Sequence, residues 1–142
     1  MKGEIEFKNV TFYYPTRPDS KVLTSLSTKF ELGKTTAIVG PSGAGKSSIA
    51  LMIERFYEPS EGEVLIDGKP LKSLNLKHYR NQIGYVSQEP VLFNTTIKKN
   101  IQMGKPDATD EEIINALQKT NAWEFVSKYP EGINTSVGSS GN

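Results

Sequence analysis

The stretch GPSGAGKS, residues 40–47, decides the fold of this sequence. It matches the pattern G-x-x-x-x-G-K-[ST] at every fixed position. Glycines let the backbone curl so that successive N–H groups point inward at phosphate oxygens, and a helix that follows adds its positive N-terminal end. Average residue usage produces this pattern by chance in well under about 1% of chains of this size. The stretch therefore predicts a phosphate-binding loop.

The charged and hydroxyl groups of the loop have separate expected roles. Lys46 brings a positive charge to the β- and γ-phosphates, and Ser47 brings a hydroxyl to Mg²⁺, so a metal–nucleotide complex is the expected ligand. The alternative is a glycine-rich turn that only connects a strand to a helix. The residues expected to contact the nucleotide are Gly40, Pro41, Ser42, Gly43, Ala44, Gly45, Lys46, Ser47 and Ser48.

The flanks of the loop favour phosphate binding over a plain turn. TTAIVG at 35–40 is a short β-branched and apolar run without a polar face, typical of a strand buried on both sides. After the loop, Ile49, Ile53 and Phe56 recur at helical spacing. IGYVSQ at 83–88 has the pattern of another buried strand. A strand, a glycine loop and a helix in succession are the context that this motif requires.

The rest of the chain reads as mixed α and β. Apolar residues that alternate with a period of two predict two early strands at 4–14 and 21–32, expected to form an antiparallel pair. Asp67-Gly68 suits the tight turn of a hairpin, and 75–82 has the pattern of a short helix. A longer helix is expected after Thr109, an N-cap with Glu112 as its capping-box partner. The last third is predicted to be mainly helical.

Composition excludes several classes of site. The 142 residues fit one domain of ordinary size, and 17 basic against 16 acidic residues give a net charge of +1. That charge provides no general attraction for nucleic acid. The absence of cysteine excludes disulfides and thiolate metal sites. No apolar stretch approaches the roughly 20 residues needed to cross a bilayer, so this chain taken alone is expected to be soluble.

Several further motifs agree in order and spacing with one known family. The sequence resembles the nucleotide-binding domain of ATP-binding cassette (ABC) transporters, most closely the multidrug-exporter group that includes P-glycoprotein-like proteins. The resemblance rests on IEFKNVTFYYPTRPD (5–19), VLTSLSTKFELGKTTAIVGPSGAGKSS (22–48), RFYEPSEGEVLIDG (55–68), IGYVSQEPVLFNTTIKKNI (83–101) and TSVGSSG (135–141).

The resemblance implies an α/β fold with a P-loop NTPase (RecA-like) core. Within a partial, truncated domain over 1–142, it implies an N-terminal antiparallel β subdomain at 1–35 and the P-loop core at 36–93. The start of a helical subdomain would occupy 94–142. The family's signature L-S-G-G-Q, its catalytic Glu and its switch histidine would all follow the last residue. This chain alone is therefore expected to bind ATP with Mg²⁺ at best weakly and not to hydrolyse ATP.

Two further site residues are implied by the same resemblance. Tyr14 matches the aromatic residue that stacks on adenine, and Tyr13 is its rival because alternation places the two rings on opposite faces. Gln88 matches the glutamine that reaches Mg²⁺ and the attacking water, which makes it a catalytic candidate together with Lys46. From the residues alone, Gln88 also reads as a polar group at a strand end. Glu89–Phe93 would contact the membrane domain.

The implied parent protein couples ATP hydrolysis to export across a membrane. Its partners would be the transmembrane domains of the same transporter and a second nucleotide-binding domain in a head-to-tail dimer, and this chain would lie on the cytosolic face. Unpaired strand edges would favour self-association of the chain. The alternatives from other classes are a stand-alone P-loop nucleotide-binding module and a kinase or GTPase without a transport role.

Some residues imitate functional groups or depart from the family pattern. Asp67 is interpreted as a turn residue, His78 as a surface residue, and Lys98-Lys99 as a solvated helix face. Exporters commonly have Glu where this chain has Lys99. They also commonly have T-E-V-G-E-R-G where 135–141 reads TSVGSSG, so that Ser136, Ser139 and Ser140 replace ion-pairing residues.

Overall fold

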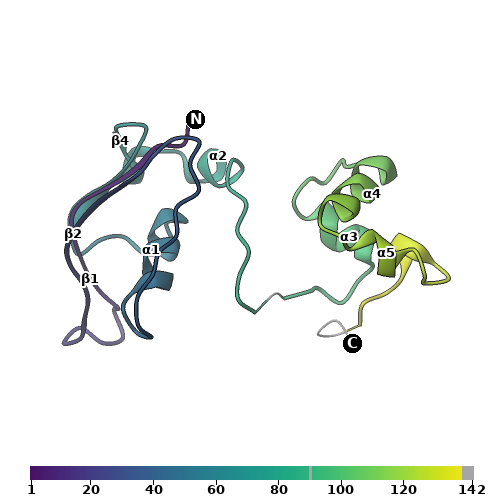
Figure 1. Cartoon of the computed structure of the whole chain (residues 1–142), viewed down its shortest axis with the longest axis horizontal. Helices are drawn as coiled ribbons and strands as arrows, with labels where there is room; N and C mark the ends of the chain where they lie inside the picture. Colours follow the sequence, from purple (N-terminus) through teal and green to yellow (C-terminus); the bar gives the residue numbers. More distant parts are fainter. Residues whose placement is uncertain (90, 139–142) are drawn as a thin grey trace. The chain divides into compact units, whose positions relative to one another are not determined.

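The computed structural model describes residues 1–89 and 91–138. The chain forms two compact units, Met1–Tyr85 and Val86–Asn142. The first contains the sheet and the predicted phosphate loop, and the second contains three helices (Figure 1). Ser139 and Ser140, two of the positions that depart from the family pattern, lie outside the described residues.

A four-stranded antiparallel sheet forms the first unit's framework. Its strands are β1 (Ile5–Tyr13), β2 (Lys21–Phe30), β3 (Glu61–Ile66) and β4 (Lys69–Pro70), in the order β2-β1-β3-β4. β1 pairs with both β2 and β3, so it is a central strand. The structure confirms the two early antiparallel strands and the hairpin at the Asp67-Gly68 turn.

The core of this unit lies between the sheet and α1 (Lys46–Ile53). Phe7, Val10 and Phe12 of β1 are almost fully buried, and Met52 of α1 has no exposed surface. Burying such side chains stabilises the fold by about 1.5–3 kcal/mol each. The remaining buried members of the core cluster are Leu23, Ile49, Val64, Ile66, Leu71 and Tyr79. This packing fixes α1, and with it the loop that precedes the helix, against the sheet.

A close backbone approach accounts for an irregularity in the β1–β3 pairing. The register shifts between Lys8 and Thr11, and Asn9 adopts a φ of 49°. Gly62 has a φ of 78°, and a Cβ there would lie 2.3 Å from the carbonyl oxygens of Lys8 and Asn9. Only glycine fits at this position without displacing the central strand.

Helix α1 is shorter than its apolar spacing predicted. It ends at Ile53, and Arg55 has a φ of 55°, which turns the chain away from the helical path. Phe56 is consequently 55% exposed, and the expectation that it continues the apolar face of the helix is wrong. The guanidinium of Arg80 covers the Phe56 ring at 4.6 Å from its centroid.

Two short helical elements complete the first unit. η1 (Leu71–Ser73) follows the hairpin, and α2 (Leu76–Arg80) begins after Asn75, whose side chain accepts a hydrogen bond from the His78 amide. Within α2, the Tyr79 hydroxyl donates to the Ile53 carbonyl at 2.7 Å and so links α2 to the end of α1. Burial, then the charge of Glu54, raises the pKa of Tyr79 to about 12. The short helix expected at 75–82 is confirmed.

The two segments predicted as buried strands do not form strands here. Residues 35–40 and 83–88 are irregular in the described structure, and Val39 and Val86 are 89% and 92% exposed. A strand of a parallel sheet requires hydrogen-bonded neighbours, and the sheet that forms here is entirely antiparallel. Among the described residues, these two apolar segments therefore have no neighbouring strand to pair with.

The second unit is helical, as predicted. It contains α3 (Ile97–Gln102), α4 (Asp110–Lys119), α5 (Trp123–Val126) and the short η2 (Gly132–Asn134). Its core consists of Ala108, Ile113, Leu117, Val126 and Ile133. The Thr109 and Glu112 capping box is present at the start of α4. No helix in the described part of the chain is both long enough and apolar enough to cross a membrane.

Candidate functional site

The predicted phosphate loop runs directly into the first turn of α1. Gly45 is the N-cap residue, with a φ of 82° that L residues rarely adopt. A Cβ at Gly45 would lie 2.7 Å from Leu23 Cδ2 and 3.1 Å from the Val22 carbonyl oxygen. The glycine therefore allows the loop to pass close to β2 while it turns into the helix.

Among residues 1–89 and 91–138, no side chain caps the N-terminus of α1. Gly45 offers no side-chain cap, and the first turn of α1 contains no acidic residue. The first four N–H groups of a helix have no intrahelical acceptor, and they carry the positive end of the helix dipole. This end of α1 therefore has the properties of an anion-binding site.

Lys46 folds back over the loop. Its Nζ donates to the carbonyl oxygens of Gly40 at 2.8 Å and Pro41 at 2.6 Å. An ammonium group prefers anionic acceptors, and here two neutral carbonyl oxygens accept its hydrogen bonds instead. The side chain can exchange them for phosphate oxygens without leaving the loop.

Ser47 and Ser48 occupy different environments on the first turn of α1. Ser47 is exposed, whereas Ser48 is only 4% exposed. Ser48 Oγ lies 2.7 Å from the hydroxyl oxygen of Tyr14, at hydrogen-bond distance. The structure thus brings Tyr14 to the helix that follows the phosphate loop.

The two adjacent tyrosines have separate surroundings, as alternation predicted. The half-buried Tyr14 ring packs edge-on against Phe12, with centroids 4.9 Å apart, and against Tyr57, at 5.2 Å. The ammonium of Lys21 lies 5.5 Å from the centroid of the Tyr13 ring. Sequence reasoning did not identify Tyr57, because it lies in an irregular segment between α1 and β3 where periodicity gives no signal.

The donor set at the loop suits a metal ion that arrives with phosphate. Within residues 1–89 and 91–138, no group of three or more His, Cys, Asp or Glu side chains could hold a metal ion. Mg²⁺ commonly takes only one or two protein ligands together with phosphate oxygens and waters. The exposed Ser47 hydroxyl at the start of α1 is compatible with that mode.

Gln88 belongs to the second unit, whereas the predicted phosphate loop belongs to the first. Its side chain is exposed in a bend, next to a turn in which the Ser87 hydroxyl donates to the Glu89 carbonyl. The structure therefore does not assemble Gln88 with Lys46 and Ser47 in one described unit.

The residues set aside as non-functional have structural partners or are exposed. Asp67 accepts hydrogen bonds from the amides of Lys2, Gly3 and Glu4, which fixes the N-terminus beside the turn. His78 is exposed. These positions confirm the interpretations of Asp67 as a turn residue and of His78 as a surface residue.

The basic pair on α3 lies partly in an ion pair. Lys98 contacts the Asp110 carboxylate of α4 at 2.5 Å, while Lys99 is exposed.

Near the end of the described chain, the Val137 amide donates to the Thr95 carbonyl at 3.0 Å. An apolar hollow of about 470 Å³ adjoins these elements in the second unit. Its lining includes Leu92, Ile97, Ile101, Leu117, Phe125 and Val137.

Comparison with known protein families decides the identity of the domain. The family model described as "ABC transporter" matches residues 23–140, which include the whole phosphate loop and α1. The chain belongs to the ABC transporter family. This match confirms the resemblance inferred from the motifs.

This ABC transporter chain is 52% identical over 145 residues to "Multidrug resistance protein 1" of Entamoeba histolytica, in an alignment that covers 100% of this chain and 11% of that relative. It is 52% identical over 141 residues to "ABC transporter B family member 1" of Arabidopsis thaliana and 45% identical over 141 residues to "ATP-binding cassette sub-family B member 5" of Homo sapiens. Each of the latter two alignments covers 99% of this chain and 11% of the relative. The chain therefore spans about a tenth of the length of these curated relatives.

A solved structure supports the fold. The chain matches "Structure of a bacterial Atm1-family ABC exporter with ATP bound" with a TM-score of 0.93 and 40% identity. The match covers 99% of this chain and 24% of that chain. The ABC transporter fold is thus shown for this domain, including its antiparallel sheet.

Proposed function

We propose that this chain is the ATP-binding portion of the ATPase domain of an ABC exporter. The observation that carries the proposal is the open N-terminus of α1, where neither a side-chain cap nor an acidic residue satisfies the helix. The preceding loop places the Lys46 ammonium beside that end. Together they provide N–H donors and a positive charge for a triphosphate.

Each group of the loop has a defined task in binding. The backbone N–H groups of the loop, at Gly40 and at 42–48, hold the phosphates, and Lys46 exchanges its carbonyl partners for β- and γ-phosphate oxygens. Ser47 contributes its hydroxyl to Mg²⁺, which neutralises phosphate charge when it is bound. The P-loop NTPase core implied by the family model and the triphosphate chemistry of the loop support ATP with Mg²⁺ as the ligand.

Tyr14 is the proposed adenine-binding aromatic. Its hydroxyl contacts Ser48 on α1, whereas the Tyr13 ring is associated with Lys21. This difference favours Tyr14 for the role. A base stacked on an aromatic ring gains on the order of 1–3 kcal/mol. Gln88 is proposed to reach the metal and the attacking water in the assembled transporter.

The activity proposed for the whole protein is export driven by ATP hydrolysis. It rests on the relatives named as ABC transporter B-family and multidrug resistance proteins and on the ATP-bound exporter whose fold this chain shares. The proposed partners are the transmembrane domains, through Glu89–Phe93, and a second nucleotide-binding domain. The divisions at 1–35, 36–93 and 94–142 are proposed as the β, core and helical parts of the domain. The relatives do not favour a stand-alone kinase or GTPase.

Replacement of Lys46 tests the proposed site. We expect Lys46→Ala to weaken Mg-ATP binding by about tenfold to a hundredfold, because a charge-assisted contact to phosphate is lost. Isothermal titration calorimetry measures the affinity. Lys34→Ala is the matched control, since it removes the same charge from an exposed side chain that pairs with Glu31. Unchanged binding by Lys46→Ala would contradict the site assignment.

A further inference from the structure

Three aromatic rings from distant parts of the first unit form one cluster. Phe12 lies near the end of β1, Tyr14 follows that strand, and Tyr57 lies between α1 and β3. The Tyr57 centroid is 5.5 Å from Phe12 and 5.2 Å from Tyr14, and the Tyr14 and Tyr57 planes are nearly perpendicular at 88°. Edge-to-face pairs at these separations are the favoured aromatic geometry. The Tyr14 ring is therefore supported on two sides.

The hydroxyl end of Tyr14 is held as well. Its oxygen lies 2.7 Å from Ser48 Oγ, and Ser48 is 4% exposed. Phe12 is also buried, at 2% exposure, so its loss would disturb the core of the whole unit. Tyr57 is half-buried and its ring packs against the edge of the cluster. It is the member whose replacement can change the support of Tyr14 with the least effect on the core.

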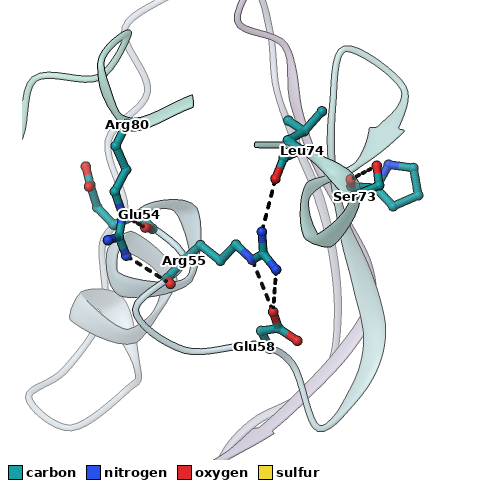
Figure 2. A network of polar contacts seen from close by, with 7 residues as sticks. Glu54, Arg55, Glu58, Ser73, Leu74 and Arg80 are labelled. Carbon is teal, nitrogen blue, oxygen red and sulfur yellow. Dashed lines mark hydrogen bonds and ion pairs between the residues drawn. The ribbon is translucent and has the colours of Figure 1, made fainter. Parts of the chain in front are cut away.

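A polar network fixes the chain on both sides of Tyr57 (Figure 2). Arg55 donates to the Leu74 carbonyl and, through Nε and Nη2, to Glu58 Oε1. Arg80 donates to the carbonyl oxygens of Glu54 and Arg55. In Figure 2 the Arg80 guanidinium approaches the backbone at Glu54 and Arg55, whereas the Arg55 guanidinium points toward Leu74 and Glu58. Arg55 precedes Tyr57 and Glu58 follows it, so the network restrains the backbone that carries the ring.

We propose that Tyr57 is a positioning residue for nucleotide binding, which holds the Tyr14 ring in the orientation that accepts the adenine base. This inference rests on the proposed function of the site. A ring that is already ordered loses less conformational freedom when a base stacks on it. Tyr57 acts through Tyr14 and through no contact with the phosphates, so its contribution is confined to ligands that carry a base.

The test compares a nucleotide with a ligand that lacks the base. Affinities of Mg-ATP and of Mg-tripolyphosphate are measured by calorimetry for the wild-type chain and for Tyr57→Leu. We expect Tyr57→Leu to weaken ATP binding by about threefold to tenfold and to leave tripolyphosphate binding unchanged. Tyr57→Phe, which keeps the ring, is expected to retain the wild-type ATP affinity. Phe125→Leu, which removes a 55% exposed ring in the second unit, is the matched control and should bind both ligands as the wild type does.

A second measurement needs no ligand. Carbon-13 relaxation of the Tyr14 ring reports its order directly, and we expect a lower ring order parameter in Tyr57→Leu than in the wild type. Should Tyr57→Leu not fold, Tyr57→Met replaces it, since methionine fills the space without a ring.

The outcomes separate the inference from the proposed function. Equal ATP affinities for the wild type and Tyr57→Leu, or equal loss for both ligands, overturn the positioning role and leave the proposed function intact. An unchanged Tyr14 order parameter overturns it as well. A folded wild-type chain that binds neither ligand overturns the proposed function, and this inference with it.

Discussion

The N-termini of α1 and α4 differ in how their free backbone N–H groups are satisfied. α4 satisfies its own free N–H groups with a full capping box from Thr109 and Glu112, and Asp110, Glu111 and Glu112 provide negative charge in its first turn. α1 has Gly45 in the cap position, no side-chain cap and no acid. A helix end that is capped internally has little to offer a ligand, whereas an open one can bind an anion. The difference supports the proposal that the N-terminus of α1 binds phosphate.

The largest effect is expected from a variant that disrupts the backbone geometry at the N-terminus of α1. Gly45→Ala should lower the free energy of unfolding by about 2–4 kcal/mol, because a left-handed residue is strained and its Cβ would clash with β2. Urea unfolding followed by circular dichroism measures this value. Gly43→Ala is the control, since it has a φ of 79° with nothing within 4 Å of its Cβ, and it should cost only about 1–2 kcal/mol. Equal costs at the two glycines would contradict this explanation.

A second variant gives α1 the acid that α4 already has. Ser47→Asp should weaken Mg-ATP binding by at least about tenfold, because its carboxylate repels phosphate and competes for the N–H groups. The same charge should raise the free energy of unfolding slightly, by about 0.3–1 kcal/mol. Calorimetric titration and thermal unfolding measure the two effects. Ser47→Asn is the neutral control of similar size, and a variant with wild-type ATP affinity would argue against phosphate binding at this helix end.

The reciprocal variant removes the cap of α4. Thr109→Ala should destabilise the chain by about 1 kcal/mol, since the Glu112 amide loses its acceptor. ATP affinity should not change, because the N-terminus of α4 is capped by its own side chains and is not proposed to bind phosphate. Thr120→Ala, at the opposite end of α4, is a control for the loss of a threonine hydroxyl. A large loss of ATP affinity in Thr109→Ala would refute the contrast between the two helix ends.

The smallest expected effect is a pH dependence at α4. The hydrogen bond from Lys105, then that from the Thr109 amide, lowers the pKa of Glu112 below 4.5. A lowered folded-state pKa contributes stability above the unfolded-state value, and this contribution is lost as pH falls through the folded-state pKa. Glu112→Gln should therefore reduce the loss of stability below pH 4.5. Urea unfolding between pH 2 and 6 measures the slope, with Glu111→Gln as control, and identical slopes for Glu112→Gln and wild type would oppose this assignment.

Local signals predicted the parts of the fold that depend on neighbouring residues. The antiparallel strands, the Asp67-Gly68 turn and the Thr109 capping box each arise from a short pattern whose partners lie nearby or follow by a hairpin. The predicted phosphate loop likewise leads directly into α1, as the adjacent motif indicates. Patterns of this kind carry most of their structural information within a few residues.

The expectations that failed depend on partners elsewhere. Residues 35–40 and 83–88 have the composition of buried parallel strands, but composition does not provide the neighbours that such strands require. Helix α1 ends at Ile53, earlier than the apolar spacing predicts, and Arg55 adopts a left-handed conformation just beyond it. The contact between Tyr14 and Tyr57 joins residues far apart in the sequence, and no periodicity announces it.

The most direct test of the central claim observes both helix ends during one titration. In a spectrum of backbone amides, addition of Mg-ATP should shift the resonances of 43–48, at the loop and the start of α1, and should leave those of 109–112 in place. Mg²⁺ alone is the control for effects of the metal. Saturable shifts confined to the first group are the predicted result. Shifts at 109–112 with none at 43–48 would contradict the assignment of α1 as the phosphate-binding helix.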